Sequence, residues 1–275
     1  MKRILITGAN SYIGESVKIY LGQYPDRYLV DILNTLGLEP TSEMFSKYDV
    51  VFNVAGIAHI KETEENRQLY YDINCDFAVN MAKAAKEGGV RQFIHLSSMS
   101  VYGLTEGYIT KNMMPNPVNA YGESKLMADE KIRKLEDENF KFVCLRPPMV
   151  YGKGCKGNYQ TLRSFALKSP VFPLFRNQRS MIFIDNLSEF IKEMIDGECA
   201  GLFFPQNEAY VCTCEMVRLI SNFGEKKIKL LSLGNPLIHI SKSNLVKKVF
   251  GSLTYEKVDI VSKFNFYESI ELTER

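Results

Sequence analysis

The sequence predicts an α/β fold, in which a doubly wound parallel sheet is followed by a smaller, loop-rich C-terminal lobe. Short apolar segments alternate with longer segments of helical periodicity in the first half of the chain, as in strand-helix-strand units. Several apolar segments run directly into glycine or serine, as strands do when their carboxyl ends carry a ligand site. The 275 residues, 45% of them hydrophobic, suffice for one large core and a smaller lobe.

The composition argues against several classes of function. The 34 basic and 32 acidic residues leave a formal charge of +2, too balanced for a protein that binds nucleic acid or an anionic membrane surface. No basic and apolar leader precedes the first strand, and no apolar run approaches membrane-spanning length, so we expect a cytoplasmic protein. The six cysteines and three histidines lack the spacing of a zinc site or redox pair, which predicts reduced thiols and no metal centre.

The first strand and the turn after it predict a nucleotide site. Residues Ile4 to Ile6 suit a buried parallel strand, and Gly8 allows an immediate turn. Gly14 lets the next helix pack closely on the strand, and the helix N-terminus suits a pyrophosphate. The usual dinucleotide fingerprint has a third glycine where this chain has Ser11, so an ordinary strand-to-helix turn is the alternative.

The second strand is expected over residues 28–33, after a helix that ends before Pro25. Asp31 is the acidic residue of this strand, and it lies about 20 positions beyond the glycines, where an acid binds the adenosine ribose in NAD sites. A solvated position on the strand is an equal alternative. No lysine or arginine directly follows the strand, so nothing indicates a site for the extra phosphate of NADP.

The third strand, residues 49–54, ends at Ala55 and Gly56, which are small enough to let the backbone approach a cofactor. A long helix follows, in which apolar residues recur at every fourth position and predict a core-facing stripe. The members of this stripe are Leu69, Ile73, Phe77 and Met81. Asn74 lies beside the stripe and either bonds to neighbouring loops or faces water.

The fourth strand, residues 92–96, brings Ser97 and Ser98 to the carboxyl edge of the sheet, where ligands bind in such folds. A later helix contains Tyr121 and Lys125, whose spacing of four places both side chains on one face. The apolar residues that this helix is expected to bury are Leu126, Met127, Ile132 and Leu135.

Regular alternation ends after the fifth strand, residues 142–145. Beyond it we expect a loop-rich region that contains helices at 159–167, 187–195 and 213–223 and strands at 181–184 and 201–204. Residues 1–150, rejoined by 179–196, are therefore expected to form a dinucleotide-binding domain. Residues 151–178 and 197–275 are expected to form a smaller substrate-binding lobe.

Five motifs at successive strand ends, taken together, resemble the extended short-chain dehydrogenase/reductases. They are Thr7-Gly8 with Gly14, Asn53-Val54-Ala55-Gly56, Ser97-Ser98 with Val101-Tyr102-Gly103, Tyr121-Gly122-Glu123-Ser124-Lys125, and Arg146-Pro147 with Tyr151-Gly152. The nearest likeness is to the UDP-sugar 4-epimerases and nucleotide-sugar 4-ketoreductases of the NAD-dependent epimerase/dehydratase family, and it covers nearly the whole chain. It implies a Rossmann-type fold, NAD with NADP as the alternative, a nucleotide-diphosphate sugar substrate in polysaccharide biosynthesis, and a homodimer through residues 64–88 and 121–138.

The resemblance also implies roles for individual residues. Positions that match the family's cofactor contacts, together with Asp31, are Gly8, Ser11, Tyr12, Ile13, Gly14, Ala55, Gly56, Asn74, Ser97, Tyr121, Lys125 and Pro148. The catalytic positions are Ser98, Tyr121 and Lys125, and Ser98 also bonds the substrate oxygen. Asn158 and Arg179 match positions that bind the sugar diphosphate, for which an arginine fork is suited.

The chemistry of Tyr121 agrees with the resemblance. A phenol whose ordinary pKa is near 10 is a poor base at neutral pH. An ammonium group one helical turn away, with help from an oxidised nicotinamide, favours the phenolate, so Lys125 is predicted to lower the pKa of Tyr121. The alternative interpretation of Tyr121 and Lys125 is a pair on a solvent-exposed helix face.

Departures from the family pattern limit the reaction. Related dehydratases carry an Asp-Glu pair directly after the catalytic hydroxyl, where this chain has Met99 and Ser100, which argues against dehydration. Met149 replaces a frequent asparagine, and a second phosphate-binding arginine is not recognisable late in the chain. We therefore consider a 4-epimerase first, a 4-ketoreductase second and, from another class, a dinucleotide-binding sensor without turnover.

Overall fold

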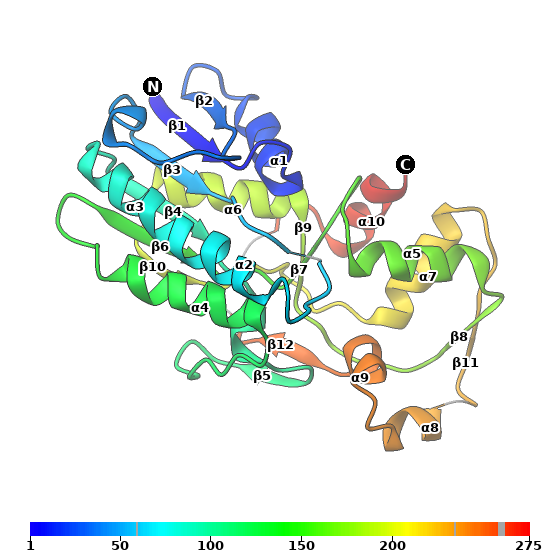
Figure 1. Cartoon of the computed structure of the whole chain (residues 1–275). Coiled ribbons are helices and arrows are strands. Elements are labelled where there is room, and N and C mark those ends of the chain that lie inside the picture. The colour runs from blue at the N-terminus through cyan, green and yellow to red at the C-terminus, as the bar shows by residue number, and fades with distance from the viewer. Residues whose placement is uncertain (59, 234, 258–261) are drawn as a thin grey trace. The chain divides into compact units, whose positions relative to one another are not determined.

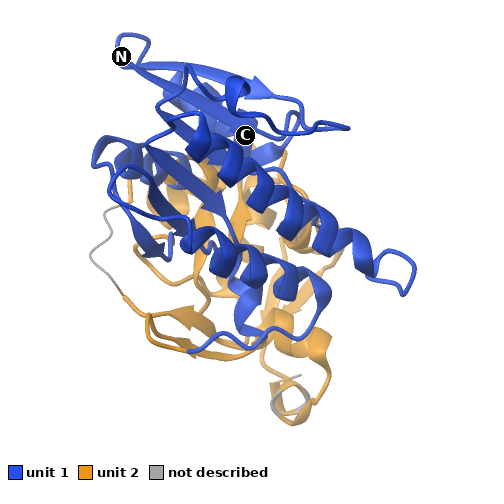
Figure 2. Cartoon of the chain, turned by 60° about the vertical axis from the view of Figure 1, so that its left-hand side comes forward, with its two compact units in different colours: residues 1–103, 114–147, 187–205 blue, residues 104–113, 148–186, 206–275 orange. Residues whose placement is uncertain are grey.

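The computed structural model describes residues 1–58, 60–233, 235–257 and 262–275 (Figure 1). The chain forms two compact units, coloured separately in Figure 2. Unit 1 contains residues 1–103, 114–147 and 187–205, and unit 2 contains residues 104–113, 148–186 and 206–275.

Unit 1 is built on a six-stranded parallel sheet with the order β10-β6-β4-β3-β1-β2. Its strands are β1 (Lys2–Thr7), β2 (Tyr28–Leu33), β3 (Val50–Asn53), β4 (Gln92–Leu96), β6 (Lys141–Leu145) and β10 (Gly201–Phe203). Because β1 lies between β2 and β3, the chain winds outward from it in both directions. The predicted doubly wound parallel sheet is confirmed, and its winding reverses beside the carboxyl ends of β1 and β3.

Helices cover both faces of this sheet. The helical segments of unit 1 are α1 (Tyr12–Leu21), η1 (Ser42–Met44), α2 (Arg67–Tyr71), the π-helical η2 (Asp72–Phe77), α3 (Ala78–Glu87), η3 (Met99–Tyr102) and α4 (Ala120–Arg133), and α6 (Ile184–Asp196) joins them from Leu187 on. The helices α3 and α4 pack on one face, over a core that includes Val51, Phe93 and Phe142. The helices α1 and α6 lie on the other face (Figure 1).

The predicted core stripe of the long helix is wrong in part. Met81 is buried, but Leu69 is 42% exposed, and Ile73 and Phe77 are only half-buried. The cause is η2, because a π-helical turn contains an extra residue and rotates the buried face. The residues that face inward at this level are Tyr70, Asn74 and Cys75.

The apolar face predicted for the helix after Tyr121 is also corrected. Ile132 is buried, whereas Met127 is 39% exposed and Leu126 and Leu135 are half-buried. Polar residues share the buried face of α4 instead, namely Ser124, Lys125 and Asp129. A helix that buries polar groups beside the carboxyl edge of a parallel sheet is a candidate site element.

The described residues of unit 2 form three separate pairs of short parallel strands. They are β7 (Met149–Tyr151) with β9 (Met181–Phe183), β8 (Val171–Pro173) with β11 (Lys229–Leu231), and β5 (Gly107–Ile109) with β12 (Leu253–Tyr255). Its helices are α5 (Asn158–Lys168), α7 (Thr213–Phe223), α8 (Asn235–Ile240), α9 (Asn244–Phe250) and α10 (Phe266–Glu274). Hydrogen bonds from Tyr159 and Arg163 to Glu274 join α5 to α10, and Tyr151 bonds to Ser269 of α10.

The two units differ from the expected domains in four segments, and one of these is residues 148–150, which were expected in the dinucleotide-binding domain and lie in unit 2. Residues 104–113 lie in unit 2, because β5 pairs with β12. Residues 179–186 also lie in unit 2, because β9 pairs with β7. Residues 197–205 lie in unit 1, because β10 extends the large sheet beside β6.

The described residues offer neither a membrane-spanning helix nor a metal-binding cluster. None of the helices there combines the length and apolar character needed to cross a bilayer. Within the same residues, no group of three or more His, Cys, Asp or Glu side chains could hold a metal ion.

Candidate functional site

The turn after β1 has the shape that a dinucleotide needs. Gly8 has φ of +88°, a left-handed conformation that favours glycine, and a Cβ there would lie 3.0 Å from the Cα of Ala55. The Gly8 amide donates to the Leu33 carbonyl at 3.0 Å, which fixes the turn to the end of β2. The ends of β1 and β3 therefore approach closely only because residue 8 has no side chain.

Ser11 takes the place of the missing third glycine by capping α1. Its hydroxyl oxygen accepts from the Gly14 amide at 3.1 Å, and a Cβ on Gly14 would lie 2.4 Å from the same oxygen. Tyr12 and Ile13 form the first turn of α1, at the positive end of the helix dipole. This cradle fits a pyrophosphate, although Glu15 adds a carboxylate to the first turn.

Asp31 lies in the middle of β2, two residues before its end at Leu33. Its carboxylate accepts from the Tyr48 hydroxyl at 2.7 Å, and the Lys47 ammonium lies 3.7 Å away. The side chain is 44% exposed. Asn34 is the first residue beyond the strand.

Asn74 bonds to a neighbouring loop, which was one of the two alternatives for this residue. Its Oδ1 accepts from the Ile57 amide at 2.8 Å, and its Nδ2 donates to the Ile57 carbonyl at 3.1 Å. A Cβ on Gly56 would lie 2.7 Å from Asn74 Oδ1 and 3.2 Å from Lys125 Nζ. The loop after β3 is thus held against both α4 and η2.

The three predicted catalytic residues meet at the carboxyl end of β4. Ser98 follows this strand and caps η3, its hydroxyl accepting from the Ser100 amide at 3.1 Å, and it is hydrogen-bonded to the Tyr121 phenol. Lys125 is 5% exposed, and its Nζ donates to the Leu96 carbonyl at 2.9 Å. A phenol, a hydroxyl and a buried amine in this arrangement can move a proton to or from a substrate oxygen.

The electrostatics of Tyr121 differ from the prediction. Burial raises the pKa of Tyr121, and the hydrogen bond from Ser98 lowers it without cancelling that rise. Burial also lowers the pKa of Lys125 to about 8, against the opposing attraction of Asp129. The predicted lowering of the Tyr121 pKa is therefore wrong for the chain alone, because desolvation, with smaller contributions of the same sign from Tyr70 and Asp129, outweighs the effect of Ser98.

The remaining predicted site residues lie in unit 2. Pro148 is buried and is the first residue of the segment 148–186 of this unit. Asn158 is exposed and is the first residue of α5. Arg179 donates from Nη1 to the Gly251 carbonyl at 2.7 Å, and burial lowers its pKa. This hydrogen bond gives Arg179 a structural partner within unit 2.

Asp129, one helical turn after Lys125, is a buried polar residue that the sequence did not single out. Asp129 accepts from Ser97 and Arg146, and Arg146 donates to Tyr102. Helical spacing could have indicated Asp129, because it follows Lys125 by four residues, as Lys125 follows Tyr121.

Comparisons with known proteins identify similar sequences and similar folds. The model of the NAD-dependent epimerase/dehydratase family matches residues 4–196. A UDP-glucose 4-epimerase of Vibrio cholerae is 29% identical over 290 residues, covering 95% of this chain and 85% of that protein.

Two solved structures share the fold over almost their whole length. The UDP-glucuronic acid 4-epimerase of Bacillus cereus in complex with NAD has a TM-score of 0.78 at 16% identity, covering 99% of this chain and 97% of its own. The dTDP-4-dehydrorhamnose reductase of Bacillus anthracis in complex with NADP has a TM-score of 0.77 at 19% identity, covering 99% and 98%.

Proposed function

The chain belongs to the NAD-dependent epimerase/dehydratase family, and we propose that it is a nucleotide-sugar 4-epimerase acting on a UDP-hexose or UDP-N-acetylhexosamine. The observation that carries the proposal is the meeting of Ser98, Tyr121 and Lys125 at the carboxyl end of β4. The 4-epimerase from Vibrio cholerae, aligned over nearly the whole chain, supports the choice of reaction.

The chain's own residues move the proton of the sugar C4 hydroxyl. NAD, when bound at the turn after β1, supplies the acceptor and donor of hydride. Tyr121 removes the hydroxyl proton while Ser98 holds the same oxygen, and the Lys125 ammonium stabilises the phenolate. After the 4-keto sugar has turned over, Tyr121 returns the proton to the oxygen, and the configuration at C4 is inverted.

The raised pKa of Tyr121 explains why this chemistry needs the cofactor's charge. Burial holds the phenol neutral in the chain alone. Lys125 would favour the phenolate together with the positive charge that an oxidised nicotinamide would supply when bound. Proton removal is thereby coupled to the presence of the oxidised cofactor.

The substrate's diphosphate is proposed to bind Asn158 and Arg179, and the cofactor to bind the residues of the turns after β1, β3 and β4, with Pro148 beside the nicotinamide. A homodimer through residues 64–88 and 121–138, a role in polysaccharide biosynthesis and a cytoplasmic location remain predictions. Light scattering during size-exclusion chromatography tests the dimer, and elution at the monomer mass would refute it.

One experiment tests the reaction and its alternatives. The purified protein is incubated with UDP- and dTDP-sugars, with and without NADH or NADPH, and the products are identified by mass spectrometry and NMR. Interconversion of 4-epimers without net redox change is expected. Consumption of reduced cofactor by a 4-keto sugar would establish the 4-ketoreductase instead, and cofactor binding without any turnover would indicate the sensor.

A further inference from the structure

One helical turn after Lys125, unit 1 buries an ion pair that the proposed chemistry does not use. The Asp129 carboxylate accepts from Arg146 Nε at 3.0 Å and from Ser97 Oγ at 2.8 Å, and Arg146 Nη1 donates to the Tyr102 hydroxyl at 2.8 Å. Asp129 is 2% exposed and Arg146 is 6% exposed. Because burying two charges costs more than an apolar pair of similar size, their retention calls for a reason beyond stability.

A second chain of hydrogen bonds approaches the same carboxylate from the strand ends. Thr7 donates to Asn53 Oδ1 at 2.6 Å, so the Asn53 amide nitrogen is left to donate to His95 Nδ1 at 3.0 Å. This order assigns the proton of His95 to Nε2, which lies 3.9 Å from Asp129 Oδ1. Burial holds the pKa of His95 well below its ordinary value, so its ring is neutral and brings no charge to Asp129.

The position of Asp129 on α4 links it to Lys125. Tyr121, Lys125 and Asp129 follow one another at intervals of four residues and share the inner face of the helix. Lys125 Nζ bonds to the carbonyl of Leu96, and Ser97, the next residue of the chain, bonds to Asp129. The amine and the carboxylate are thus anchored to adjoining residues at the end of β4.

Two groups favour the charged form of the buried Lys125, and only one of them is itself charged. These groups are Asp129 and Cys144. Burial raises the pKa of the Cys144 thiol well above its ordinary value, so this side chain is neutral. The Asp129 carboxylate is therefore the charge that offsets the desolvation of Lys125. Burial raises the pKa of Asp129, and Arg146 and Ser97 oppose that rise without cancelling it.

We propose that Asp129, held by Arg146 and Ser97, is a positioning residue that acts through Lys125 by keeping its side chain in the ammonium form. The inference rests on the proposed function, since it assumes that the ammonium serves Tyr121. The titratable and charged groups that face this cluster are Tyr121, Lys125 and Asp129 on α4, His95 on β4, Cys144 on β6, Arg146 after it, Tyr102 on η3 and Tyr70 on α2.

The direct test titrates Lys125 without sugar or cofactor. NMR of the protein labelled with 13C at lysine Cε gives the pKa of Lys125, whose signal is assigned by its absence in Lys125→Met. In Asp129→Asn this titration is expected at least one pH unit lower than in the wild type. Asp129→Ser is a second neutral variant in case the asparagine variant does not fold, and Asp129→Glu, which keeps the charge, is expected to restore the titration.

The kinetic test follows turnover against pH with the sugar identified by the product screen. In Asp129→Asn, the alkaline limb of kcat is expected to move to lower pH, with about tenfold lower kcat at pH 8 and little change in KM. The matched control is Asp49→Asn, which removes a carboxylate paired with Arg91. This variant is expected to change neither the Lys125 titration nor the alkaline limb of kcat.

The two tests separate this inference from the proposed function. A shifted Lys125 titration without turnover of any sugar would leave the inference standing and overturn the proposed reaction. Normal epimerisation with an unchanged Lys125 titration in Asp129→Asn would overturn the inference alone.

Discussion

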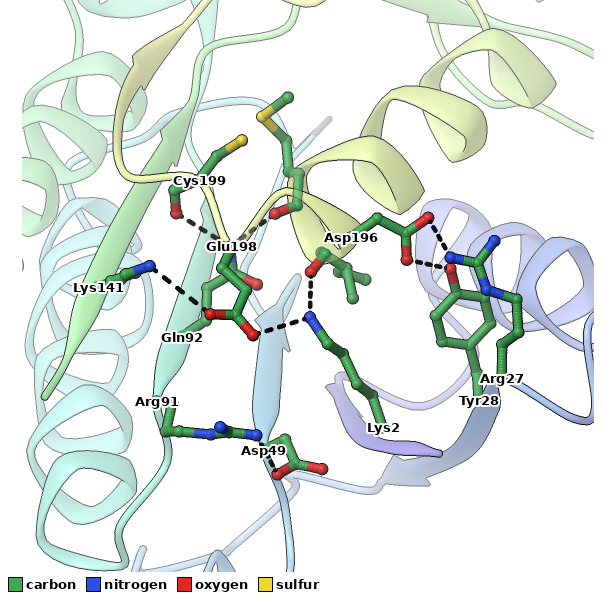
Figure 3. Close-up of polar contacts among 12 residues, drawn as sticks. Lys2, Arg27, Tyr28, Asp49, Arg91, Gln92, Lys141, Asp196, Glu198 and Cys199 are labelled. Carbon is green, nitrogen blue, oxygen red and sulfur yellow. Dashed lines mark hydrogen bonds and ion pairs between the residues drawn. The ribbon is translucent and has the colours of Figure 1, made fainter.

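The two edges of the unit 1 sheet treat charge in opposite ways. At the amino edge, Lys2 lies 3.2 Å from Glu198 and Arg91 lies 2.9 Å from Asp49, all in half-exposed or exposed positions (Figure 3). At the carboxyl edge, Lys125 is buried and reaches the end of β4. Exposed pairs contribute about 0–1 kcal/mol each, whereas a buried charge costs several kcal/mol, so the carboxyl edge bears a cost that the amino edge avoids.

A hollow of about 550 Å³ lies at the amino edge, away from the proposed chemistry. The cations that line it, namely Lys2, Lys86, Arg91 and Lys141, each pair with a carboxylate. Open space alone therefore does not mark the site of this protein. The difference between the edges indicates that the buried polar groups at the carboxyl ends of the strands serve the chemistry. The paired surface charges at the amino ends do not serve it.

The largest expected contrast between the edges concerns two phenols. Tyr121→Phe at the carboxyl edge is expected to lower kcat by about 10²–10⁴-fold, because it removes the group that transfers the proton. Tyr28→Phe removes a hydroxyl that bonds to Asp196 near the amino edge and should leave kcat unchanged. Steady-state kinetics with measured NAD binding checks both, and equal turnover in the two variants would favour the sensor.

Lys125→Met is expected to stabilise the cofactor-free protein at pH 7 by about 2 kcal/mol. The lowering of the Lys125 pKa from 10.5 to about 8 corresponds to a penalty of about 3 kcal/mol, from which one lost hydrogen bond subtracts about 1. Between about pH 8 and pH 10.5 the Lys125 side chain is protonated in the unfolded chain but not in the folded chain. The wild-type protein therefore becomes more stable as the pH rises through this range, and the stabilisation by Lys125→Met becomes smaller. Urea unfolding at pH 7 and 9.5 measures the change, and Lys141→Met at the amino edge should show neither effect.

Two glycines with nearly the same backbone conformation sharpen the comparison. Gly8 and Gly89 have φ of +88° and +85°, but a Cβ would meet Ala55 only at Gly8, since nothing lies within 4 Å at Gly89 in the described chain. Alanine costs about 1–2 kcal/mol at either position from the backbone, and at Gly8 overpacking adds about 1–3 kcal/mol. Calorimetric NAD titration should show at least about tenfold weaker binding for Gly8→Ala alone.

The position of a carboxylate along β2 is expected to decide its effect on NAD. Asp31 bonds to Tyr48 before the strand ends, so Asp31→Asn should change the dissociation constant of NAD by less than about threefold. Asn34→Asp places a carboxylate beyond the strand and should favour NAD over NADP by about fivefold. Fluorescence titration with both cofactors measures this, and a large loss in Asp31→Asn would establish Asp31 as the ribose contact.

The smallest expected effect is at Arg91. Arg91→Gln breaks a pair with Asp49 in which the arginine side chain is 64% exposed, so the change in unfolding free energy should stay below about 1 kcal/mol. This small change should fall further at high salt, because screening weakens exposed pairs. Urea unfolding at low and high salt checks it, and a larger, salt-independent loss would contradict the contrast between the edges.

The sequence predicted best where a local rule connects residue to structure. Gly8, Gly56 and Ser98 follow apolar strands, so their place at the carboxyl edge followed from alternation alone. The spacing of Tyr121 and Lys125 likewise fixed their common face. These rules depend on neighbours in the chain and needed no knowledge of packing.

Other features depended on contacts that are distant in sequence. Asp129 shares the helix face that the spacing of Tyr121 and Lys125 indicates, but only the approach of Arg146 and Ser97, which the sequence does not show, makes it a buried partner. The direction of the Tyr121 pKa shift was also mispredicted, because it depends on burial by residues that are distant in the sequence. The strands of unit 2 span three residues each, too few to show alternation.

The extra residue wound into η2 makes the function of this helix sensitive to its length. Deleting one residue between Asp72 and Phe77 would restore ordinary winding and turn the predicted apolar stripe inward. The same deletion would swing the amide of Asn74 away from Ile57 and release the loop beside Gly56. A shorter relative could therefore keep every side-chain type in this segment and still lose its hold on the cofactor loop.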